Sequence, residues 1–392
     1  MKDIKRVTEL EVEGKHVLVR VDFNLPLDEG RILDDSRIFA ALPTIKYLIS
    51  SKARIIITTH LGRPGGKVKE ELRLDPVAQH LSNLLQQSVI KVDQILGREV
   101  DRAVSQLGTG QVLMLENLRF NPGEKACDSE FVDQLASLGD CYVNDAFGAA
   151  HRKHASTWGV ARALPSAAGF LLLRELEVIQ GALEDPERPF LALLGGAKIG
   201  DKIGVIKTLL EIADGILIGG GMANTFLRAQ GHQLGESLVD EEAVAEAREL
   251  MALADEKGVE IKLPTDCVVA EEFSAEAAHR VSSPAQVAAG ERVLDIGPEA
   301  RAEFLQSLKG AKTVIWNGPL GVFEWPAFAR GTRELVNALA GSEATTIIGG
   351  GESAAVVKEL GLEREMTHLS TGGGAFLQLL AEKTLPALEV LK

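Results

Sequence analysis

The most constraining feature of this 392-residue chain is the regular alternation of short apolar segments with longer helical ones. The apolar segments are continuous, without polar residues at every second position, which is typical of parallel strands covered on both faces. They lie at 16–22, 54–60, 112–117, 141–146, 190–195, 215–219, 260–263, 267–270, 313–317, 345–349 and 367–370. Repeated strand–helix–strand order predicts an α/β fold with doubly wound parallel sheets.

The helical patterns between these segments indicate where the chain divides. We expect helices at 37–50, 75–86, 129–138, 201–213, 240–257, 298–309, 328–340 and 352–360. One more helix, at 172–185, ends in a charged, proline-containing break. Strongly twisted sheets rarely exceed roughly ten strands, so two domains are favoured over one wide sheet. The sequence therefore predicts domains at 1–171 and 186–375, joined by the helix 172–185.

The net charge of −14 lies wholly in residues 172–392, because residues 1–171 carry equal numbers of acidic and basic side chains. An acidic protein is a poor general nucleic-acid binder, although a local cationic pocket for a small anion remains open. The sequence shows no signal peptide and no run of about 18 apolar residues. Its three cysteines lack a metal-binding spacing. We expect a cytoplasmic protein with no membrane and no nucleic-acid partner.

Three glycine triplets each follow an apolar strand and precede a helix, at Gly219–Gly221, Gly349–Gly351 and Gly372–Gly374. Strand ends in a parallel sheet share one edge, and free helix N-terminal N–H groups bind phosphate. The triplets therefore favour a phosphate or nucleotide site over three tight turns that need positive φ. The segment 349–354 also fits G-x-G-x-x-A, a weak dinucleotide fingerprint, because the expected acidic residue is not clearly placed.

The segment GGAKIGDK places Lys198 and Lys202 four residues apart at an expected helix start. Residues four apart share a helix face, and lysines at a helix N-terminus oppose the helix dipole. A bound anion between the two ammonium groups resolves this conflict. The alternative is a pair of solvated lysines.

Arginine or histidine also follows each of the first four strands. Two arguments favour an anion site there: ligands bind at the carboxyl edge of open α/β sheets, and arginine suits phosphate and carboxylate. The alternative is local pairing, of Arg37 with Asp34 or Asp35 and of Arg119 with Glu116. The residues at these strand ends are Arg20, Asp22, Asn24, Arg37, His60, Arg63, Glu116, Arg119, His151, Arg152 and His154.

A zinc site made by His151, His154 and Asp145 is a weaker interpretation, because Arg152 lies between the two histidines. The sequence shows no G-x-S-x-G elbow and no evident Cys–His pair. A site without a nucleophile suits phosphoryl transfer, in which positioning and charge neutralisation carry most of the catalysis.

At these residues the chain resembles the phosphoglycerate kinase family, over essentially its whole length. The motifs that carry the resemblance occur in the family's order: RVDFNLPL, HLGRPGG, LENLRF, NDAFGAAHRKHAST, LGGAKIGDKIGVI, IGGGMANTF, PTD, DIGP, WNGPLGVFE and STGGGA. The resemblance implies two α/β domains facing a central cleft, with 3-phosphoglycerate on the N-terminal side and ATP or ADP on the other. It also implies that a last helix, 376–390, returns residues 376–392 to the N-terminal domain.

The resemblance implies roles for individual residues as well. The phosphoglycerate would be bound by Asp22, Phe23, Asn24, Arg37, His60, Leu61, Gly62, Arg63, Arg119 and Arg152. The nucleotide would be bound by Gly196, Lys198, Lys202, Gly220, Asn317, Glu324, Gly350, Gly351, Glu352 and Ser353. The groups closest to the transferred phosphoryl would be Arg37, Lys198, Gly351 and Gly374.

This chain departs from the family pattern at Glu352, where aspartate is usual next to the nucleotide-bound Mg²⁺. Glutamate adds one methylene, and Mg²⁺ demands near-ideal octahedral geometry, so altered metal affinity or preference is expected. Phe376 and Gln378 also replace the usual serine and glutamate of the last motif.

The expected reaction is reversible transfer of the acyl phosphate of 1,3-bisphosphoglycerate to ADP, in line and after domain closure, by a monomer that uses Mg²⁺ with the nucleotide. A carboxylate attacks in the reverse direction, and it is already ionised at neutral pH, so no general base is needed. Two alternatives stay open: an NAD-dependent dehydrogenase, based on 349–354, and a non-catalytic nucleotide-binding protein, in which Glu352 marks lost chemistry.

Overall fold

The computed structural model describes residues 4–391 and divides into two compact units. Unit 1 is the chain up to Glu177 together with the residues from Thr384 onward, and unit 2 is Val178–Lys383. Helix α7 (Phe170–Glu184) runs across the division after Glu177. The two parallel sheets and the joining helix agree with the predicted fold class.

Unit 1 is built on a six-stranded parallel sheet in the order β5-β6-β4-β1-β7-β8. Val17 of β1 pairs with Ile55 of β4 on one side and with Cys141 of β7 on the other. The strands are β1 (His16–Val21), β4 (Arg54–Thr58), β5 (Val89–Lys91), β6 (Val112–Met114), β7 (Cys141–Asp145) and β8 (Ser166–Ala168). The short strands β2 (Leu27–Asp28) and β3 (Arg31–Ile32) form a separate hairpin.

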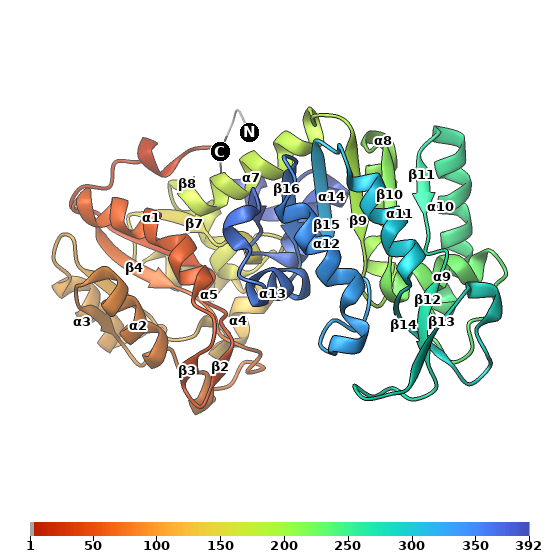
Figure 1. The fold of residues 1–392 in the computed structure, drawn as a ribbon. Helices are drawn as coiled ribbons and strands as arrows, with labels where there is room; N and C mark the ends of the chain where they lie inside the picture. The colour runs from red at the N-terminus through yellow and green to blue at the C-terminus, as the bar shows by residue number, and fades with distance from the viewer. Residues whose placement is uncertain (1–3, 392) are drawn as a thin grey trace. The chain divides into compact units, whose positions relative to one another are not determined.

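Helices lie on both faces of this sheet (Figure 1). One layer contains α1 (Ser36–Ser50) and α2 (Asp75–Leu85), which contact each other, and α4 (Pro122–Ala126), α5 (Ser129–Ala136) and α6 (Val160–Ala163) form another contacting group. Helix α3 (Arg98–Gln106) follows β5. Covering both faces buries the central strands, which explains their uninterrupted apolar sequences.

Unit 2 contains a second six-stranded parallel sheet, in the order β11-β10-β9-β15-β16-β17. The strands are β9 (Phe190–Leu194), β10 (Gly215–Ile218), β11 (Glu260–Lys262), β15 (Thr313–Asn317), β16 (Thr345–Gly349) and β17 (His368–Leu369). One group of contacting helices is α8 (Ile203–Ile212), α9 (Gly220–Ala229), α10 (Val244–Lys257) and α14 (Gly373–Glu382). The other is α11 (Pro298–Leu308), α12 (Arg330–Ala340) and α13 (Gly351–Glu359).

Residues 267–270 correct one prediction. They form β12 (Cys267–Ala270), which is antiparallel to both β13 (His279–Ser282) and β14 (Arg292–Ile296) in a separate three-stranded sheet. The four residues of β12 are all buried, so their sequence looks like that of a parallel strand. The partner β13 is mostly exposed and carries no apolar run, which explains why the sequence did not indicate the antiparallel pairing of β12.

The C-terminal segment differs from the expected single helix over 376–390. Helix α14 ends at Glu382, Lys383 adopts a left-handed conformation, and a short 3-10 turn follows at Pro386–Val390. Residues 376–382 pack in unit 2, where α14 contacts α8, and the return to unit 1 begins at Thr384. Proline cannot continue a helix, so Pro386 begins a separate turn.

No helix within residues 4–391 is long and apolar enough to cross a membrane.

Candidate active site

The polar residues of unit 1 gather at one edge of its sheet because β1, β4, β6 and β7 run parallel. Asp22 and Asn24 follow β1, His60 follows β4, and Arg119 follows β6 in a 3-10 turn at Leu118–Phe120. Arg152 lies in the segment after β7. The structure thus brings together the strand-end residues that the sequence predicted to converge.

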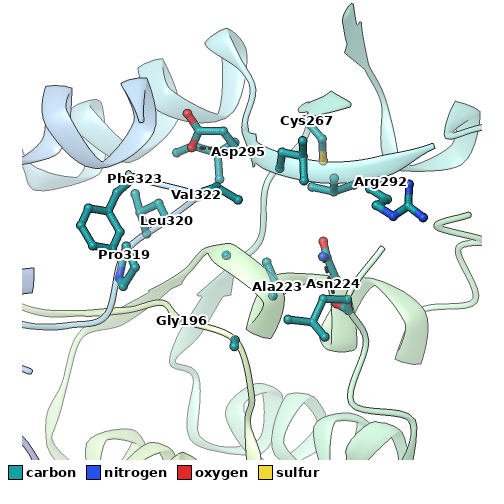
Figure 2. Close-up of a pocket in the computed structure, with 18 of the residues that line it drawn as sticks. Gly196, Ala223, Asn224, Cys267, Arg292, Asp295, Pro319, Leu320, Val322 and Phe323 are labelled. Atoms are coloured by element: carbon teal, nitrogen blue, oxygen red, sulfur yellow. Dashed lines mark hydrogen bonds between the residues drawn. The ribbon is translucent and has the colours of Figure 1, made fainter. Parts of the chain in front are cut away.

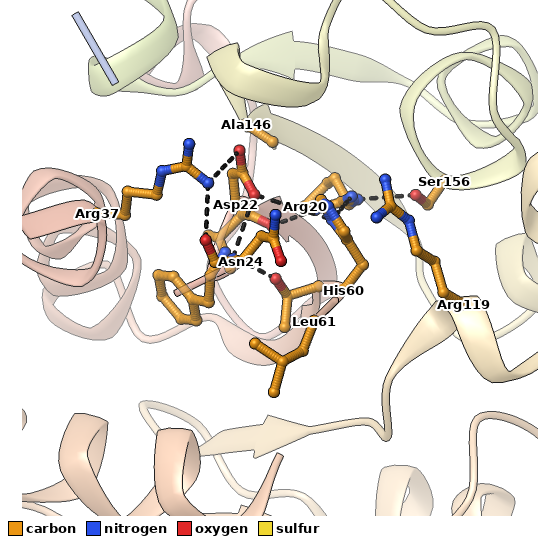
Figure 3. Close-up of polar contacts among 12 residues, drawn as sticks. Arg20, Asp22, Asn24, Arg37, His60, Leu61, Arg119, Ala146 and Ser156 are labelled. Atoms are coloured by element: carbon orange, nitrogen blue, oxygen red, sulfur yellow. Dashed lines mark hydrogen bonds and ion pairs between the residues drawn. The ribbon is translucent and has the colours of Figure 1, made fainter. Parts of the chain in front are cut away.

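Arg37 lies in the first turn of α1 and joins the two residues that follow β1 (Figure 3). Its Nη1 lies 2.9 Å from the carbonyl oxygen of Asn24, to which it donates, and 3.3 Å from Oδ2 of Asp22. The Asn24 side chain in turn accepts the Gly62 N–H at 2.8 Å. The Arg37 side chain stays 27% exposed, so part of its guanidinium is open to a ligand.

Arg20 and His60 lie beneath this edge, both almost fully buried. Nη2 of Arg20 is 2.8 Å from Nδ1 of His60 (Figure 3). Burial lowers the pKa of His60 well below its usual range, and nearby guanidiniums, above all that of Arg20, lower it further. His60 is therefore neutral at pH 7, and it can donate or accept a hydrogen bond without adding to the positive charge.

Arg119 and Arg152 complete the cationic cluster. Arg119 donates to the Gly62 carbonyl at 2.6 Å, and Arg152 donates from Nε to Nε2 of His151 at 2.9 Å. Burial, followed by the charges of Arg152 and Arg20, lowers the pKa of Arg119 to about 10. Burial also lowers the pKa of Arg152. Guanidiniums that disfavour one another's charge are relieved by a bound anion, so this cluster suits a phosphate or carboxylate.

Local acid pairing does not explain this cluster. Asp35 is 2.8 Å from Nε2 of His80, and the buried Glu116 binds Arg73 at 3.1 Å and Lys91 at 2.9 Å. These partners occupy Asp35 and Glu116, two of the three acids that the alternative interpretation named, and Arg37 pairs instead with Asp22 of the site itself.

The remaining predicted residues of this half are placed unequally. Arg63 is exposed, whereas the side chains of Phe23 and Leu61 belong to the hydrophobic core. The Phe23 N–H donates to Thr59 Oγ1 at 2.9 Å, and the Leu61 N–H donates to Asn117 Oδ1 at 3.1 Å. Phe23 and Leu61 can therefore border a ligand only through their main chain.

Asp145 caps the start of a helix and is not placed to bind zinc with His151 and His154. It is fully buried, and its Oδ1 accepts the N–H groups of Leu171 (2.9 Å) and Leu172 (3.3 Å) at the start of α7. Burial raises its pKa to about 7. The described residues contain one candidate metal cluster, which is Asp75, Asp93 and Glu116 and does not include Asp145.

The raised pKa of Asp145 predicts a pH-dependent effect of Asp145→Asn. The folded protein keeps a proton that the unfolded chain loses above its pKa of 3.8, so this group's contribution to stability falls as pH rises from about 4 to about 7. Asparagine does not titrate, so the unfolding free energy of Asp145→Asn relative to wild type should rise by up to about 4 kcal/mol over that range. Urea denaturation at about pH 5 and pH 8 should show roughly 2.6 kcal/mol of this rise, with the exposed Asp133→Asn as control. A difference that is the same at both pH values contradicts the assignment.

The glycine turns of unit 2 meet at the corresponding edge of its sheet. Gly220, at φ +64°, lies so close to the neighbouring turns that a Cβ would be 2.9 Å from the Pro319 carbonyl and 3.0 Å from the Gly196 nitrogen. At the other end, a Cβ on Gly373 would be 3.2 Å from Cα of Gly350. The turns after β9, β10 and β15 thus pack together, as do those after β16 and β17. The N–H groups of Gly196 and Gly220 donate to the carbonyl oxygens of Pro319 and Leu320, so the main-chain N–H groups suited to phosphate are those of the turns after β16 and β17, at the starts of α13 and α14.

The two lysines after β9 do not share a helix face, which corrects that prediction. Residues 200–202 form a 3-10 turn and α8 begins only at Ile203, so Lys198 lies in the preceding loop and is exposed. Lys202 is buried, and its ammonium donates to the carbonyl oxygen of Gly195, with that of Asn317 at 3.4 Å. Lys198 is thus the lysine whose ammonium is exposed and accessible to a ligand. The Lys202 ammonium instead joins the turns after β9 and β15 through its contacts with Gly195 and Asn317.

Asn317 and Ser353 hold this edge together from below. Both are buried; Nδ2 of Asn317 donates to the Gly349 carbonyl at 2.8 Å, and Ser353 Oγ accepts the Gly318 N–H at 2.7 Å. Helix α13 begins directly above them, with Gly350 (φ +101°) as its N-cap and Glu352 exposed in its first turn.

A cavity of about 630 Å³ adjoins the glycine turns (Figure 2). Gly196, Gly220, Glu324 and Glu352, all predicted nucleotide ligands, line it. Its other walls come from α9, from the antiparallel sheet and from the loop after β15, with Ala223, Asn224, Leu238, Phe273, Arg292, Leu294, Pro319, Leu320, Val322 and Phe323 among the lining residues. A largely apolar cavity next to phosphate-binding turns suits a nucleobase and its ribose.

Arg20 is among the strand-end residues predicted to meet an anion, but the family resemblance does not include it in the ligand set, and the sequence does not indicate the apolar walls of this cavity. Arg20 has a signal, because it precedes Asp22 at a strand end. The cavity wall that β14 forms has a weaker signal, because Asp295 interrupts its apolar residues Val293, Leu294 and Ile296. The dinucleotide alternative also finds no support: the strand after Gly349–Ala354, β17, is followed by Ser370 and Thr371 where an acidic residue is needed.

Comparison with known proteins agrees with this geometry. A family model described as "Phosphoglycerate kinase" matches residues 7–383. A phosphoglycerate kinase from Moorella thermoacetica is 56% identical over 383 residues, covering 98% of each chain, and one from Herpetosiphon aurantiacus is 54% identical over 386 residues, also covering 98% of each. The solved structure of phosphoglycerate kinase from Coxiella burnetii is similar with a TM-score of 0.88 and 40% identity, covering 99% of this chain and 98% of that one.

Proposed function

The chain belongs to the phosphoglycerate kinase family, and from this premise we propose how its residues divide the family's reaction between the two units. The reaction is reversible transfer of the acyl phosphate of 1,3-bisphosphoglycerate to ADP, which gives 3-phosphoglycerate and ATP. In this proposal, unit 1 binds the phosphoglycerate and unit 2 binds the nucleotide.

The guanidinium cluster of unit 1 is the observation that carries the assignment. Four guanidiniums lie around a neutral imidazole, and burial and mutual repulsion lower the pKa values of two of them, Arg119 and Arg152, so a bound anion that offsets this repulsion is favoured. In our proposal, Arg37 and Asn24 bind the carboxyl end of the phosphoglycerate, while Arg63, Arg119 and Arg152 bind its phosphate. His60 supplies a neutral hydrogen-bonding group between them, and Gly62 presents main chain.

In unit 2, we assign the base and ribose to the cavity bordered by Gly196, Gly220 and Glu324, and the phosphates to the turns at Gly350–Glu352. The N–H groups of Gly351 and Gly374, at the starts of α13 and α14, face developing charge on the transferred phosphoryl group. Lys198 neutralises the same charge from its exposed loop, and Lys202 holds the turn beneath.

The chemistry requires placement and neutralisation, because the attacking carboxylate is already ionised. Arg37 and Lys198 belong to different units. Transfer therefore requires that the units bring both cations to one phosphoryl group, and we propose closure of the units as that step. Closure also excludes water, which protects ATP from hydrolysis.

Glu352 is the residue that would hold Mg²⁺ with the nucleotide. Mg²⁺ keeps several waters and is usually bound by one or two carboxylates together with substrate phosphates, and the exposed Glu352 carboxylate beside the α13 N-terminus fits this pattern. The Asp75, Asp93 and Glu116 cluster does not, because the Lys91 ammonium lies within 2.9 Å of all three carboxylates. When bound, the ion neutralises phosphate charge.

Substitution of Glu352 should therefore change the Mg²⁺ requirement. Glu352→Ala is expected to raise the Mg²⁺ concentration for half-maximal rate by about tenfold, and Glu352→Asp to lower it several-fold, because the shorter carboxylate restores the family's geometry. Rates measured against free Mg²⁺ at fixed nucleotide test this, with the exposed Glu363→Asp as control. Identical Mg²⁺ dependence in all variants contradicts the role.

A coupled assay of ATP formation from 1,3-bisphosphoglycerate and MgADP tests the function. We expect turnover that depends on both substrates, and nucleotide binding without turnover would favour the non-catalytic alternative. The assay requires no NAD chemistry of this chain, which separates it from the dehydrogenase alternative. The monomeric state and the cytoplasmic location stay predictions, to be checked by light scattering and by fractionation.

A further inference from the structure

A chain of hydrogen bonds links a buried carboxylate to the imidazole of the phosphoglycerate half-site. Figure 3 shows the part of this chain that runs from Ser156 through Arg20 to His60. We infer that Glu124, acting through Ser156 and Arg20, fixes His60 in the tautomer that carries its proton on Nε2. Glu124 and Ser156 are positioning residues in this inference, since they act on the ligand through Arg20 and His60. The role of this tautomer in substrate binding rests on the proposed function, whereas the tautomer itself does not.

The first link is between Glu124 of α4 and Ser156. Glu124 is 1% exposed, and its carboxylate accepts the Ser156 N–H at 3.0 Å and the Ser156 hydroxyl at 2.6 Å. Ser156 lies in a single π-helical turn at Ala155–Gly159, and its carbonyl accepts the Tyr142 hydroxyl at 2.7 Å. The Ser156 hydroxyl proton is therefore committed to Glu124, and its oxygen lone pairs remain available as acceptors.

The second link is between Ser156 and Arg20. Nε of Arg20 donates to Ser156 Oγ at 2.8 Å, and its Nη1 donates to the carbonyl oxygen of Val21. These two bonds fix the plane of the guanidinium at a site where Arg20 is 1% exposed. The orientation of Nη2, which contacts His60, thus depends on the serine hydroxyl and on the carboxylate behind it.

The third link determines the tautomer. Nη2 of Arg20 lies 2.8 Å from Nδ1 of His60, and a guanidinium can only donate. Nδ1 must therefore be the unprotonated acceptor, so that a neutral His60 carries its proton on Nε2. Asp22 Oδ1, 3.8 Å from Nδ1, is beyond hydrogen-bond distance and does not compete.

This tautomer matters for an anionic ligand. With the proton on Nε2, the ring offers a donor to a substrate oxygen, whereas the opposite tautomer would face Arg20 with a second donor and present a lone pair to the anion. The ring stays neutral because burial and four guanidiniums oppose its protonation. The charged groups that face it are Arg20, Arg119, Arg152, Arg37 and Asp22.

The test uses ¹⁵N NMR of the histidine ring nitrogens in the ligand-free full-length protein at about pH 7.5, with His60→Gln to assign the signal. Wild type should show His60 protonated on Nε2 alone.

Ser156→Ala removes the Arg20 acceptor, and we expect it to populate the Nδ1–H form of His60. It should also raise KM for 3-phosphoglycerate about tenfold, with kcat within about threefold of wild type. Glu124→Gln should also increase the Nδ1–H population and KM for 3-phosphoglycerate, to a smaller extent. Ser166→Ala is the matched control. Ser166 is a buried serine of β8 whose hydroxyl donates to main-chain carbonyls (2.9 Å to Leu164). Ser166→Ala should change neither the His60 tautomer nor KM for 3-phosphoglycerate.

A wild-type His60 that is protonated on Nδ1, or on both nitrogens, overturns the inference. So does a His60 signal that is unchanged in both Ser156→Ala and Glu124→Gln. A changed tautomer with unchanged KM supports the inference about the hydrogen-bond chain and instead contradicts the placement of His60 in the phosphoglycerate site.

Discussion

Replacing Arg37 by alanine is expected to lower kcat about 10³-fold or more. Arg37 is held by Asp22 and by the Asn24 carbonyl, yet 27% of its side chain stays exposed, so one part is anchored while another can reach a ligand. In the proposed mechanism it neutralises the charge that develops between the carboxylate and the transferred phosphoryl group. This charge is greatest in the transition state, and for that reason kcat should fall more steeply than substrate affinity.

Two further variants separate this role from a general loss of charge or fold. Arg37→Lys keeps the charge but loses the planar pair of donors, so its kcat should lie between those of wild type and Arg37→Ala. Arg31→Ala removes an exposed arginine from β3 of the same unit and should leave kcat unchanged. The assay is steady-state turnover with both substrates saturating, together with thermal unfolding. If Arg37→Ala turns over within threefold of wild type, the assignment of Arg37 is wrong.

Lys198→Ala is expected to lower kcat by about 10²- to 10³-fold with little change in stability. Lys198 is exposed in the loop between β9 and α8, so its removal costs little packing. Its ammonium is the cation of this loop that can approach a bound phosphate, because that of Lys202 already contacts two carbonyl oxygens.

Comparison with the two neighbouring lysines makes the test specific. Lys207→Ala removes an exposed lysine of α8 and should leave turnover intact. Lys202→Ala should instead reduce thermal stability, because it removes the group that joins the turns after β9 and β15. Equal loss of turnover in Lys198→Ala and Lys207→Ala would mean that charge in general, not the position of Lys198, supports the rate.

The sequence predicted the central strands of the two parallel sheets, because these strands are buried on both faces and therefore continuously apolar, but it missed the edge strands β5 and β8 of unit 1. The same signal failed at residues 267–270, since a buried antiparallel strand such as β12 has the same composition. It also failed for β13, most of whose residues are exposed. Apolar composition reports burial, and it does not report the direction of the neighbouring strand.

The convergence of Arg37, His60, Arg119 and Arg152 was predictable because parallel strands end at one edge of a sheet. The orientation of side chains was not. The spacing of Lys198 and Lys202 indicated a shared helix face, but the chain forms a 3-10 turn there and buries one lysine against carbonyl oxygens. Nothing in the sequence pattern indicated that Glu124 contacts Ser156, because this hydrogen bond joins residues 32 positions apart.

In our proposal the site works by placing and neutralising anions, without moving a proton. The solvent deuterium isotope effect on single-turnover phosphoryl transfer from ATP to 3-phosphoglycerate, measured by rapid quench, tests this most directly. A rate in D₂O within about 20% of that in H₂O is the predicted result, because the attacking carboxylate is already ionised and the nearby His60 is neutral. A rate that falls about twofold or more in D₂O would show that a proton is transferred in the rate-limiting step, and it would contradict the proposed mechanism.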